Sequence, residues 1–102
     1  MEVDCFQVDF STRTITRDGT SVDVTQKDFD LAVLFLRNVG RLLSRNYITE
    51  SVWRESGSVT SRTLDTHVSR IRLKLGLVSQ HGWELKAVYA HGYRLERKQA
   101  AG

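Results

Sequence analysis

Proline is absent from the 102-residue chain, and cysteine occurs only once, at Cys5. A single cysteine excludes an intrachain disulfide and points to a reducing compartment. The sequence also lacks a low-complexity linker that would separate two domains. We therefore expect one domain, formed by residues 1–98, followed by a disordered tail at residues 99–102.

Long apolar runs are also missing. No segment approaches the roughly 20 consecutive apolar residues that a membrane-spanning helix requires. The N-terminus has neither the basic start nor the apolar stretch of a secretory signal. We therefore expect a soluble, cytoplasmic protein without a membrane partner.

Motifs of common enzymes and metal sites are absent too. The sequence has no Gly-rich phosphate loop, no paired carboxylates at a plausible site and no nucleophile motif. A hydrolase would need a Ser–His pair assembled across the fold, which nothing in the sequence suggests. The spacing of metal ligands is not found among His67, His81, His91 and Cys5. We predict no enzyme activity, no cofactor and no metal site.

The composition is that of a folded domain with a modest basic excess. Hydrophobic residues make up 40% of the chain and charged residues 26%, which is typical of a globular protein rather than a disordered one. Fifteen Lys and Arg residues against twelve Asp and Glu give a formal net charge of +3. Such an excess permits binding to phosphates, but it fits a solvated surface without a ligand equally well.

Residues 3–24 have the pattern of a small antiparallel sheet. Phe6, Val8 and Phe10 alternate with polar residues, as expected for a half-buried strand. The pair Asp18-Gly19 then predicts a tight turn between two segments rich in β-branched residues.

Two amphipathic helices are expected next. Thr25 can cap the first, in which Phe29 begins an apolar face of helical period and which Gly40 would end. The second is expected to start near Ser44, a good N-cap residue, and to stop before the turn-forming residues 56–58. Its predicted apolar side consists of Tyr47, Ile48, Val52 and Trp53.

A third helix is predicted at residues 61–75, with one apolar and one basic face. The apolar stripe consists of Leu64, Val68, Ile71 and Leu75. The opposite face carries Arg62, Thr66, Ser69, Arg70 and Leu73, and Arg72 and Lys74 lie on its flanks. Two helices joined by a short loop, the second with a basic outer face, are typical of a helix-turn-helix.

The chain closes with a predicted hairpin. Trp83, Leu85 and Ala87 alternate with polar residues, residues 90–92 supply the turn, and residues 93–96 return. Trp83 is expected in the core, as is Trp53; base stacking is the alternative, and it would require exposed rings over a basic groove.

This order of elements, together with its motifs, resembles the C-terminal DNA-binding domain of response regulators of the OmpR/PhoB family. The similarity extends over nearly the whole chain. It is carried by Val24–Leu31, Asn38–Arg45, Val52-Trp53, Ser61–Gly76 and Gly92–Leu95.

The resemblance implies an α+β fold: a winged helix-turn-helix with an N-terminal antiparallel four-stranded sheet, three helices and a C-terminal β-hairpin wing. It implies that residues 61–75 enter the major groove of double-stranded DNA and that the wing touches the adjacent minor groove. In this family the domain regulates transcription as the output of a two-component system. It binds direct repeats as a tandem homodimer and contacts RNA polymerase. A receiver domain usually precedes it and is absent from this sequence.

We expect the DNA contacts to come from the third helix and the wing. The candidates are Arg62, Thr66, Ser69 and Arg70 for bases or phosphates, Arg72 and Lys74 for phosphates, and His91 and Arg94 in the wing. The expected polymerase-contact loop comprises Arg54, Glu55, Ser56, Gly57 and Ser58. A solvated helix face, or a winged helix that uses the same face for a protein partner, is the alternative.

Three further residues carry expectations of their own. Tyr89 stands where many family members have an arginine in the wing, which leaves His91 as the nearest cationic candidate for the minor groove. His67 is expected to be a structural or phosphate-bonding histidine rather than a metal ligand. Asp65 is expected either to orient a neighbouring basic side chain or to favour the first turn of its helix.

Overall fold

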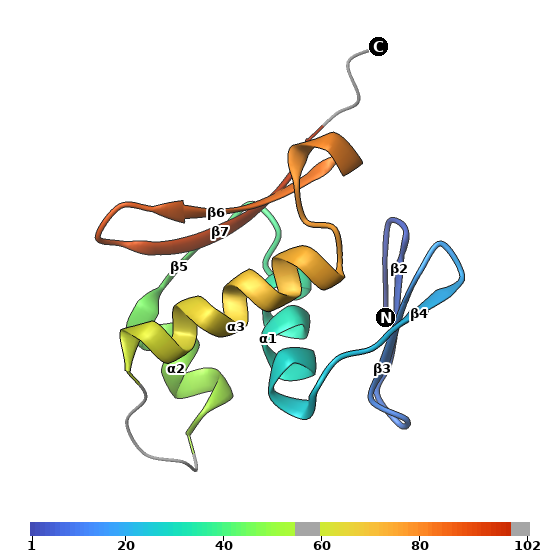
Figure 1. The fold of residues 1–102 in the computed structure, drawn as a ribbon, viewed down its shortest axis with the longest axis horizontal. Helices are drawn as coiled ribbons and strands as arrows, with labels where there is room; N and C mark the ends of the chain where they lie inside the picture. Colours follow the sequence, from blue (N-terminus) through green and yellow to red (C-terminus); the bar gives the residue numbers. More distant parts are fainter. Residues whose placement is uncertain (55–59, 99–102) are drawn as a thin grey trace.

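A computed structural model describes residues 1–54 and 60–98, in which two antiparallel sheets flank a group of helices (Figure 1). The elements are, in chain order, β1 (Glu2–Val3), β2 (Phe6–Asp9), β3 (Thr14–Arg17), β4 (Thr20–Val22), α1 (Gln26–Arg37), β5 (Leu42–Ser44), α2 (Arg45–Val52), α3 (Ser61–Lys74), the short 3-10 helix η1 (Ser79–His81), β6 (Trp83–Val88) and β7 (Gly92–Arg97). The α+β class, the four-stranded N-terminal sheet, the three α-helices within the described ranges and the C-terminal hairpin are all confirmed. The predicted tail lies outside the described residues.

The N-terminal sheet has the strand order β1-β2-β3-β4 and directs Phe6 and Ile15 into the core, both fully buried. The expectation that Phe10 continues the buried side of its strand is wrong, because β2 ends at Asp9 and Phe10 is 44% exposed. The Asp9 carboxylate accepts hydrogen bonds from the Ser11 amide, at 2.9 Å, and from the Ser11 hydroxyl, at 2.7 Å. This local turn redirects the chain before Phe10 can pair.

The C-terminal hairpin belongs to a three-stranded sheet of order β5-β7-β6, and the sequence did not predict its third strand. β5 pairs with β7 through Leu43 opposite Tyr93 and Ser44 opposite Gly92. A Cβ atom at Gly92 would overlap the carbonyl oxygen of Leu43, so this close crossing requires glycine. The predicted hairpin is therefore anchored to the segment that leads into α2.

The helix starts fall at the predicted positions. Thr25, Ser44 and Thr60 each accept a hydrogen bond from the third amide of their helix, at 3.1–3.2 Å. The predicted apolar side of the second helix is corrected at Tyr47, which is 49% exposed. Ile48 and Val52, four residues apart, face the core as predicted, and Tyr47 lies at the edge of that face.

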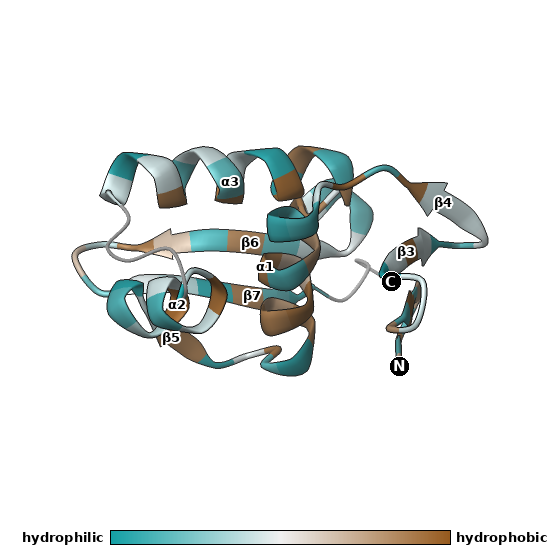
Figure 2. Cartoon of the chain, turned by 90° about the horizontal axis from the view of Figure 1, so that it is seen from below, coloured by the Kyte–Doolittle hydropathy of each residue, from teal (hydrophilic) through white to brown (hydrophobic). Residues whose placement is uncertain are grey.

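The core lies between the helices and the two sheets. Figure 2 shows the apolar side of α3 turned toward β6 and its polar side turned away from the molecule. Trp83 is 1% exposed and contacts Phe6 edge to face at 5.6 Å, so it joins the hairpin to the N-terminal sheet. Trp53 is 6% exposed, and the core positions predicted for both tryptophans are confirmed. Within the described ranges, none of the helices combines the length and apolarity needed to cross a membrane.

The far end of α3 is held by the N-terminal sheet. Arg17 of β3 donates hydrogen bonds to the carbonyl oxygens of Leu75, of Gly76, at 3.0 Å, and of His81, at 3.1 Å. The last carbonyls of a helix lack internal partners and carry partial negative charge, which a guanidinium satisfies. The helix that carries the candidate site is therefore fixed at its C-terminal end.

Candidate nucleic-acid interface

One stripe of α3 points directly away from the core. Its members are Arg62, Thr66, Ser69 and Leu73, all exposed. They recur with the spacing of a single helix face and lie opposite Leu64 and Ile71, which are fully buried. We call these four residues the outward stripe. Three of them, Arg62, Thr66 and Ser69, are predicted DNA contacts, and the structure brings those three together.

Arg62 and Thr66 offer two kinds of contact to a groove of DNA. Among the described residues, the Arg62 guanidinium has no hydrogen-bond or ion-pair partner, so its donors point to solvent. The Thr66 hydroxyl donates to the Arg62 carbonyl oxygen at 2.9 Å, which leaves the Thr66 methyl group for apolar contact. Arginine matches the two acceptors of guanine, and a threonine methyl group can touch the thymine methyl.

Arg70 does not lie on the outward stripe, and its predicted position beside Arg62 is corrected. Its Nε and Nη2 donate to one carboxylate oxygen of Asp28, at 3.1 and 2.9 Å, because Asp28 is fully buried on α1 and needs a counter-charge. Arg70 keeps 42% of its side chain exposed at the edge of the stripe. Sequence reasoning missed this pair, since an aspartate in the first turn of a helix ordinarily serves the helix terminus.

His67 completes the same cluster. Its Nδ1 lies 2.6 Å from the other oxygen of Asp28, and its ring packs edge to face against Trp53 at 5.1 Å. Burial alone would raise the pKa of Asp28, but the hydrogen bonds from His67 and Arg70 outweigh it and lower that pKa below its ordinary value. The predicted structural role of His67 is confirmed, and the cluster joins α1, α3 and the end of α2.

A second cluster joins α3 to the wing. Asp65 accepts hydrogen bonds from Arg45 of α2, at 2.8 Å, and from the hydroxyl of Tyr93 on β7. The hydrogen bond from Tyr93, aided by Arg45, lowers the pKa of Asp65. Burial, together with the Asp65 carboxylate, raises the pKa of Tyr93 and keeps its hydroxyl protonated as a donor. Asp65 therefore orients a basic side chain, one of its two predicted roles, while Arg45 and Tyr93 were not predicted as partners.

The two phosphate candidates on the flanks differ in their surroundings. Arg72 is half-buried and donates from Nε to the Leu85 carbonyl oxygen of β6, at 2.9 Å. Lys74 is exposed and lines a shallow hollow of about 400 Å³ together with residues of β4. Arg72 is thus partly engaged in holding the wing against α3, whereas the Lys74 ammonium faces solvent.

Among the predicted contacts in the wing, the one in its turn is more exposed than the one on its returning strand. His91 is exposed in the turn between β6 and β7, and Tyr89 beside it is 92% exposed. Arg94 alternates with the buried Tyr93 and therefore lies on the outer face of the sheet, with Nε 3.7 Å from Glu96. His91 and Tyr89 are accordingly better placed than Arg94 to meet a groove.

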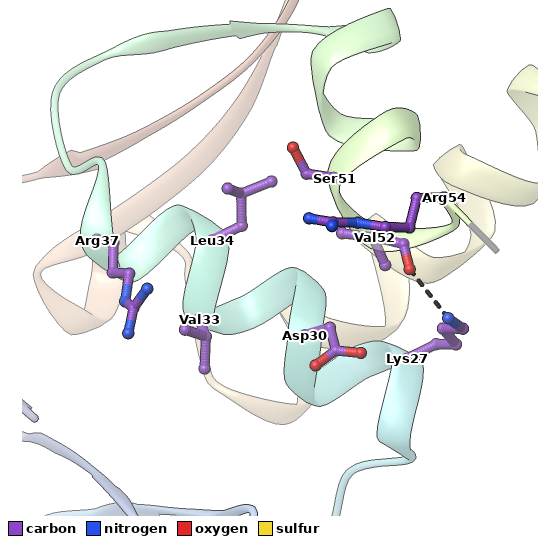
Figure 3. Close-up of a pocket in the computed structure, with 8 residues that line it drawn as sticks. All are labelled: Lys27, Asp30, Val33, Leu34, Arg37, Ser51, Val52 and Arg54. Carbon is purple, nitrogen blue, oxygen red and sulfur yellow. Dashed lines mark hydrogen bonds between the residues drawn. The ribbon is translucent and has the colours of Figure 1, made fainter. Parts of the chain in front are cut away.

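Only one residue of the predicted polymerase-contact loop can be placed. Arg54 is exposed, while Glu55, Ser56, Gly57 and Ser58 lie outside the described residues. Arg54 lines a pocket of about 400 Å³ between α1 and the end of α2, where Lys27 donates to the Val52 carbonyl oxygen at 2.9 Å (Figure 3). Arg37 and the carboxylate of Asp30 line the same pocket. Three cations therefore surround it, against one carboxylate.

The sequence matches the family model described as "Transcriptional regulatory protein, C terminal" over residues 19–95. The transcriptional regulatory protein VxrB of Vibrio cholerae is 33% identical over 89 residues, which cover 87% of this chain and 34% of that protein. The transcriptional regulatory protein ResD of Bacillus subtilis is 31% identical over 90 residues, covering 87% of this chain and 38% of ResD. The chain thus spans little more than a third of the length of these curated relatives.

Solved structures share the fold. The DNA-binding domain of Bacillus subtilis CssR superposes with a TM-score of 0.73 at 30% identity and covers 88% of this chain and 98% of its own. The DNA-binding domain of CpxR from E. coli has a TM-score of 0.79 at 24% identity, covering 97% of both chains. The Klebsiella pneumoniae RstA DNA-binding domain, in complex with the RstA box, has a TM-score of 0.77 at 21% identity and covers 94% of this chain and 95% of its own.

Proposed function

The chain belongs to the family of transcriptional regulatory protein C-terminal domains, as a winged-helix domain of the OmpR/PhoB type, and from this premise we propose that it binds double-stranded DNA sequence-specifically and regulates transcription. The observation that carries the proposal is the outward stripe. It combines an arginine without a partner among the described residues with two small hydroxyl side chains on a helix narrow enough for the major groove.

In this proposal α3 enters the major groove and is held rigidly while it does so. Asp28 fixes α3 to α1, Asp65 fixes it to α2 and the wing, and Arg17 fixes its C-terminal end. Contacts that are already oriented in the free protein lose less entropy on binding. Arg62 and Ser69 would read base edges, while Lys74 would contact the phosphate backbone.

Arg70 and Arg72 take secondary positions. The second Arg70 η nitrogen makes none of the hydrogen bonds found among the described residues, so it can reach a phosphate without breaking the pair with Asp28. Arg72 can do the same from the wing side. We propose both as backbone contacts, which position the domain without carrying sequence information.

Family membership also supports a set of partners. We propose that the domain is the output module of a cytoplasmic two-component response regulator, preceded by a receiver domain, and that two copies bind direct repeats in tandem. RNA polymerase would contact the loop at residues 54–58. The pocket lined by Lys27, Arg37 and Arg54 supports an acidic segment as the partner surface beside that loop.

Selection of bound fragments from a random duplex library tests this function. We expect enrichment of one short motif, repeated head to tail at a spacing near one helical turn. Recovery of fragments without a shared motif would contradict sequence-specific binding. It would leave the winged helix as a module for protein partners, which would then have to use the outward stripe.

A further inference from the structure

Leu73 occupies the last position of the outward stripe and is 83% exposed, far more than the other exposed leucine, Leu42, at 45%. It points in the same direction as Arg62, Thr66 and Ser69. An aliphatic side chain here covers none of the core. The stripe that faces DNA in the proposed function therefore ends in an apolar group.

Leu73 is the residue of its helical turn that points along the outward stripe. Arg70 is directed toward Asp28, and Arg72 toward the Leu85 carbonyl oxygen. Near a helix C-terminus a cation would be favoured by the helix dipole and by nearby phosphates. A leucine at this position has neither interaction. Its side chain is suited to an apolar partner.

Only one base presents an apolar group on the major-groove edge, and that base is thymine, through its 5-methyl group. We propose that Leu73 is a specificity-determining residue that contacts a thymine methyl group at one end of the site read by α3. This inference rests on the proposed function and goes beyond it by naming a base. Leu73 lies about three turns, or roughly 16 Å, from Arg62, which places the thymine about four to five base pairs from the base that Arg62 reads.

The test removes the methyl group and the leucine separately and together. On a single copy of the selected motif, each thymine is replaced in turn by deoxyuridine, which differs only by the missing methyl group. For one thymine we expect wild-type affinity to fall about three- to fivefold, the effect of losing one buried methyl group. Leu73→Ala should lose a similar amount on thymine DNA and should be insensitive to the same replacement.

Three controls sharpen this result. Leu42→Ala removes an exposed leucine away from α3 and should keep the full deoxyuridine effect. Thr66→Ser should cancel the effect at a different thymine, nearer the base read by Arg62. Because Leu73 is exposed and alanine favours helix, Leu73→Ala should keep the wild-type circular dichroism spectrum.

The outcomes separate the inference from the function beneath it. If the wild type binds its motif and no thymine couples to Leu73, or the motif lacks a thymine at that distance, the inference is overturned and DNA binding stands. An effect of Leu73→Ala only on two-copy DNA would assign the side chain to a neighbouring copy and likewise overturn it. If no duplex is bound specifically, both the inference and the proposed function are lost.

Discussion

Arg70 of α3 donates two hydrogen bonds to Asp28 of α1, from Nε at 3.1 Å and from Nη2 at 2.9 Å. Asp28 is fully buried, and His67 approaches its other oxygen. Arg70, which the sequence analysis predicted as a DNA contact, thus helps to set the position of the whole recognition helix. Loss of this ion pair should lower the stability of the fold. DNA binding should weaken only as a consequence, because the recognition helix is no longer held in position.

Asp28→Asn should therefore lower the free energy of unfolding by about 2–4 kcal/mol. Removing one partner of a buried pair leaves the other uncompensated, and the 42% exposure of Arg70 moderates the loss. Urea denaturation at pH 7 measures this change. Asp30→Asn, on the same helix, is the matched control. Its pair with Arg13 is exposed on both sides, so it should cost no more than about 1 kcal/mol. Equal losses for both variants would contradict the account.

The lowered pKa of Asp28 predicts a specific acid dependence. A carboxyl group with a lower pKa in the folded state than in the unfolded chain stabilises the fold above the unfolded value, here 3.8, and loses that contribution as pH falls through the folded value. The unfolding free energy of the wild type should fall steeply below about pH 4. Asp28→Asn should show a shallower fall, with the remainder from Asp9, Asp65 and Glu96, whose pKa values are also lowered. Parallel curves would contradict this assignment.

Arg62→Ala and Arg70→Ala should separate base reading from helix positioning. Arg62→Ala should cost about 1–3 kcal/mol on the cognate site, relax the preference at one base and leave unfolding unchanged. Arg70→Ala should lower stability and weaken cognate and scrambled duplexes alike. Fluorescence anisotropy on both duplexes, paired with urea denaturation, measures each effect. A loss of base preference confined to Arg70→Ala would reverse the two roles.

His91 predicts a minor-groove contact from the wing. It is exposed in the wing turn, and the arginine common at the Tyr89 position is missing here. A narrow A·T-rich minor groove is electronegative and attracts Arg, Lys and His side chains. His91→Ala should therefore weaken binding to a motif with A·T flanks more than to the same motif with G·C flanks. His81→Ala is the control and should bind both duplexes as the wild type does. Equal affinities of the wild type and His91→Ala for both duplexes would make His91 a bystander.

Arg54 tests the proposed contact with polymerase. Arg54→Glu reverses one of three cations around the pocket between α1 and α2, away from the outward stripe. We expect unchanged affinity for the motif and altered transcription in vitro from a promoter that depends on this domain. Arg41→Glu, an exposed charge reversal outside that pocket, should leave transcription unchanged. Unaltered transcription by Arg54→Glu would remove this part of the proposal.

The fold was predictable where periodicity and capping agree along the chain. Thr25 and Ser44 marked two helix starts because a cap depends on residues only three positions apart. β5 was missed, since three residues without a clear pattern form a strand only when β7 lies alongside. Phe10 was misplaced because a short Asp9-Ser11 turn overrides the alternation of its strand.

The candidate site was predictable only as far as helix geometry reaches. The spacing of Arg62, Thr66 and Ser69 is enough to place them on one outward face. The direction of Arg70 could not be read in this way, because its partner Asp28 is distant in sequence and becomes its neighbour only when α1 packs on α3. Arg45 was not predicted for the same reason, since its hydrogen bond to Asp65 depends on how α2 packs against α3.

The central claim, that the outward stripe binds duplex DNA specifically, is tested most directly by one titration of the selected motif and of a scrambled duplex across a series of salt concentrations. If each domain neutralises about four to six phosphates, the logarithm of affinity should fall with the logarithm of salt at a slope near −4 to −5 on both duplexes. The motif should remain tighter by a factor of at least about a thousand. A flat salt response, or equal affinity for both duplexes at every salt concentration, would contradict the account.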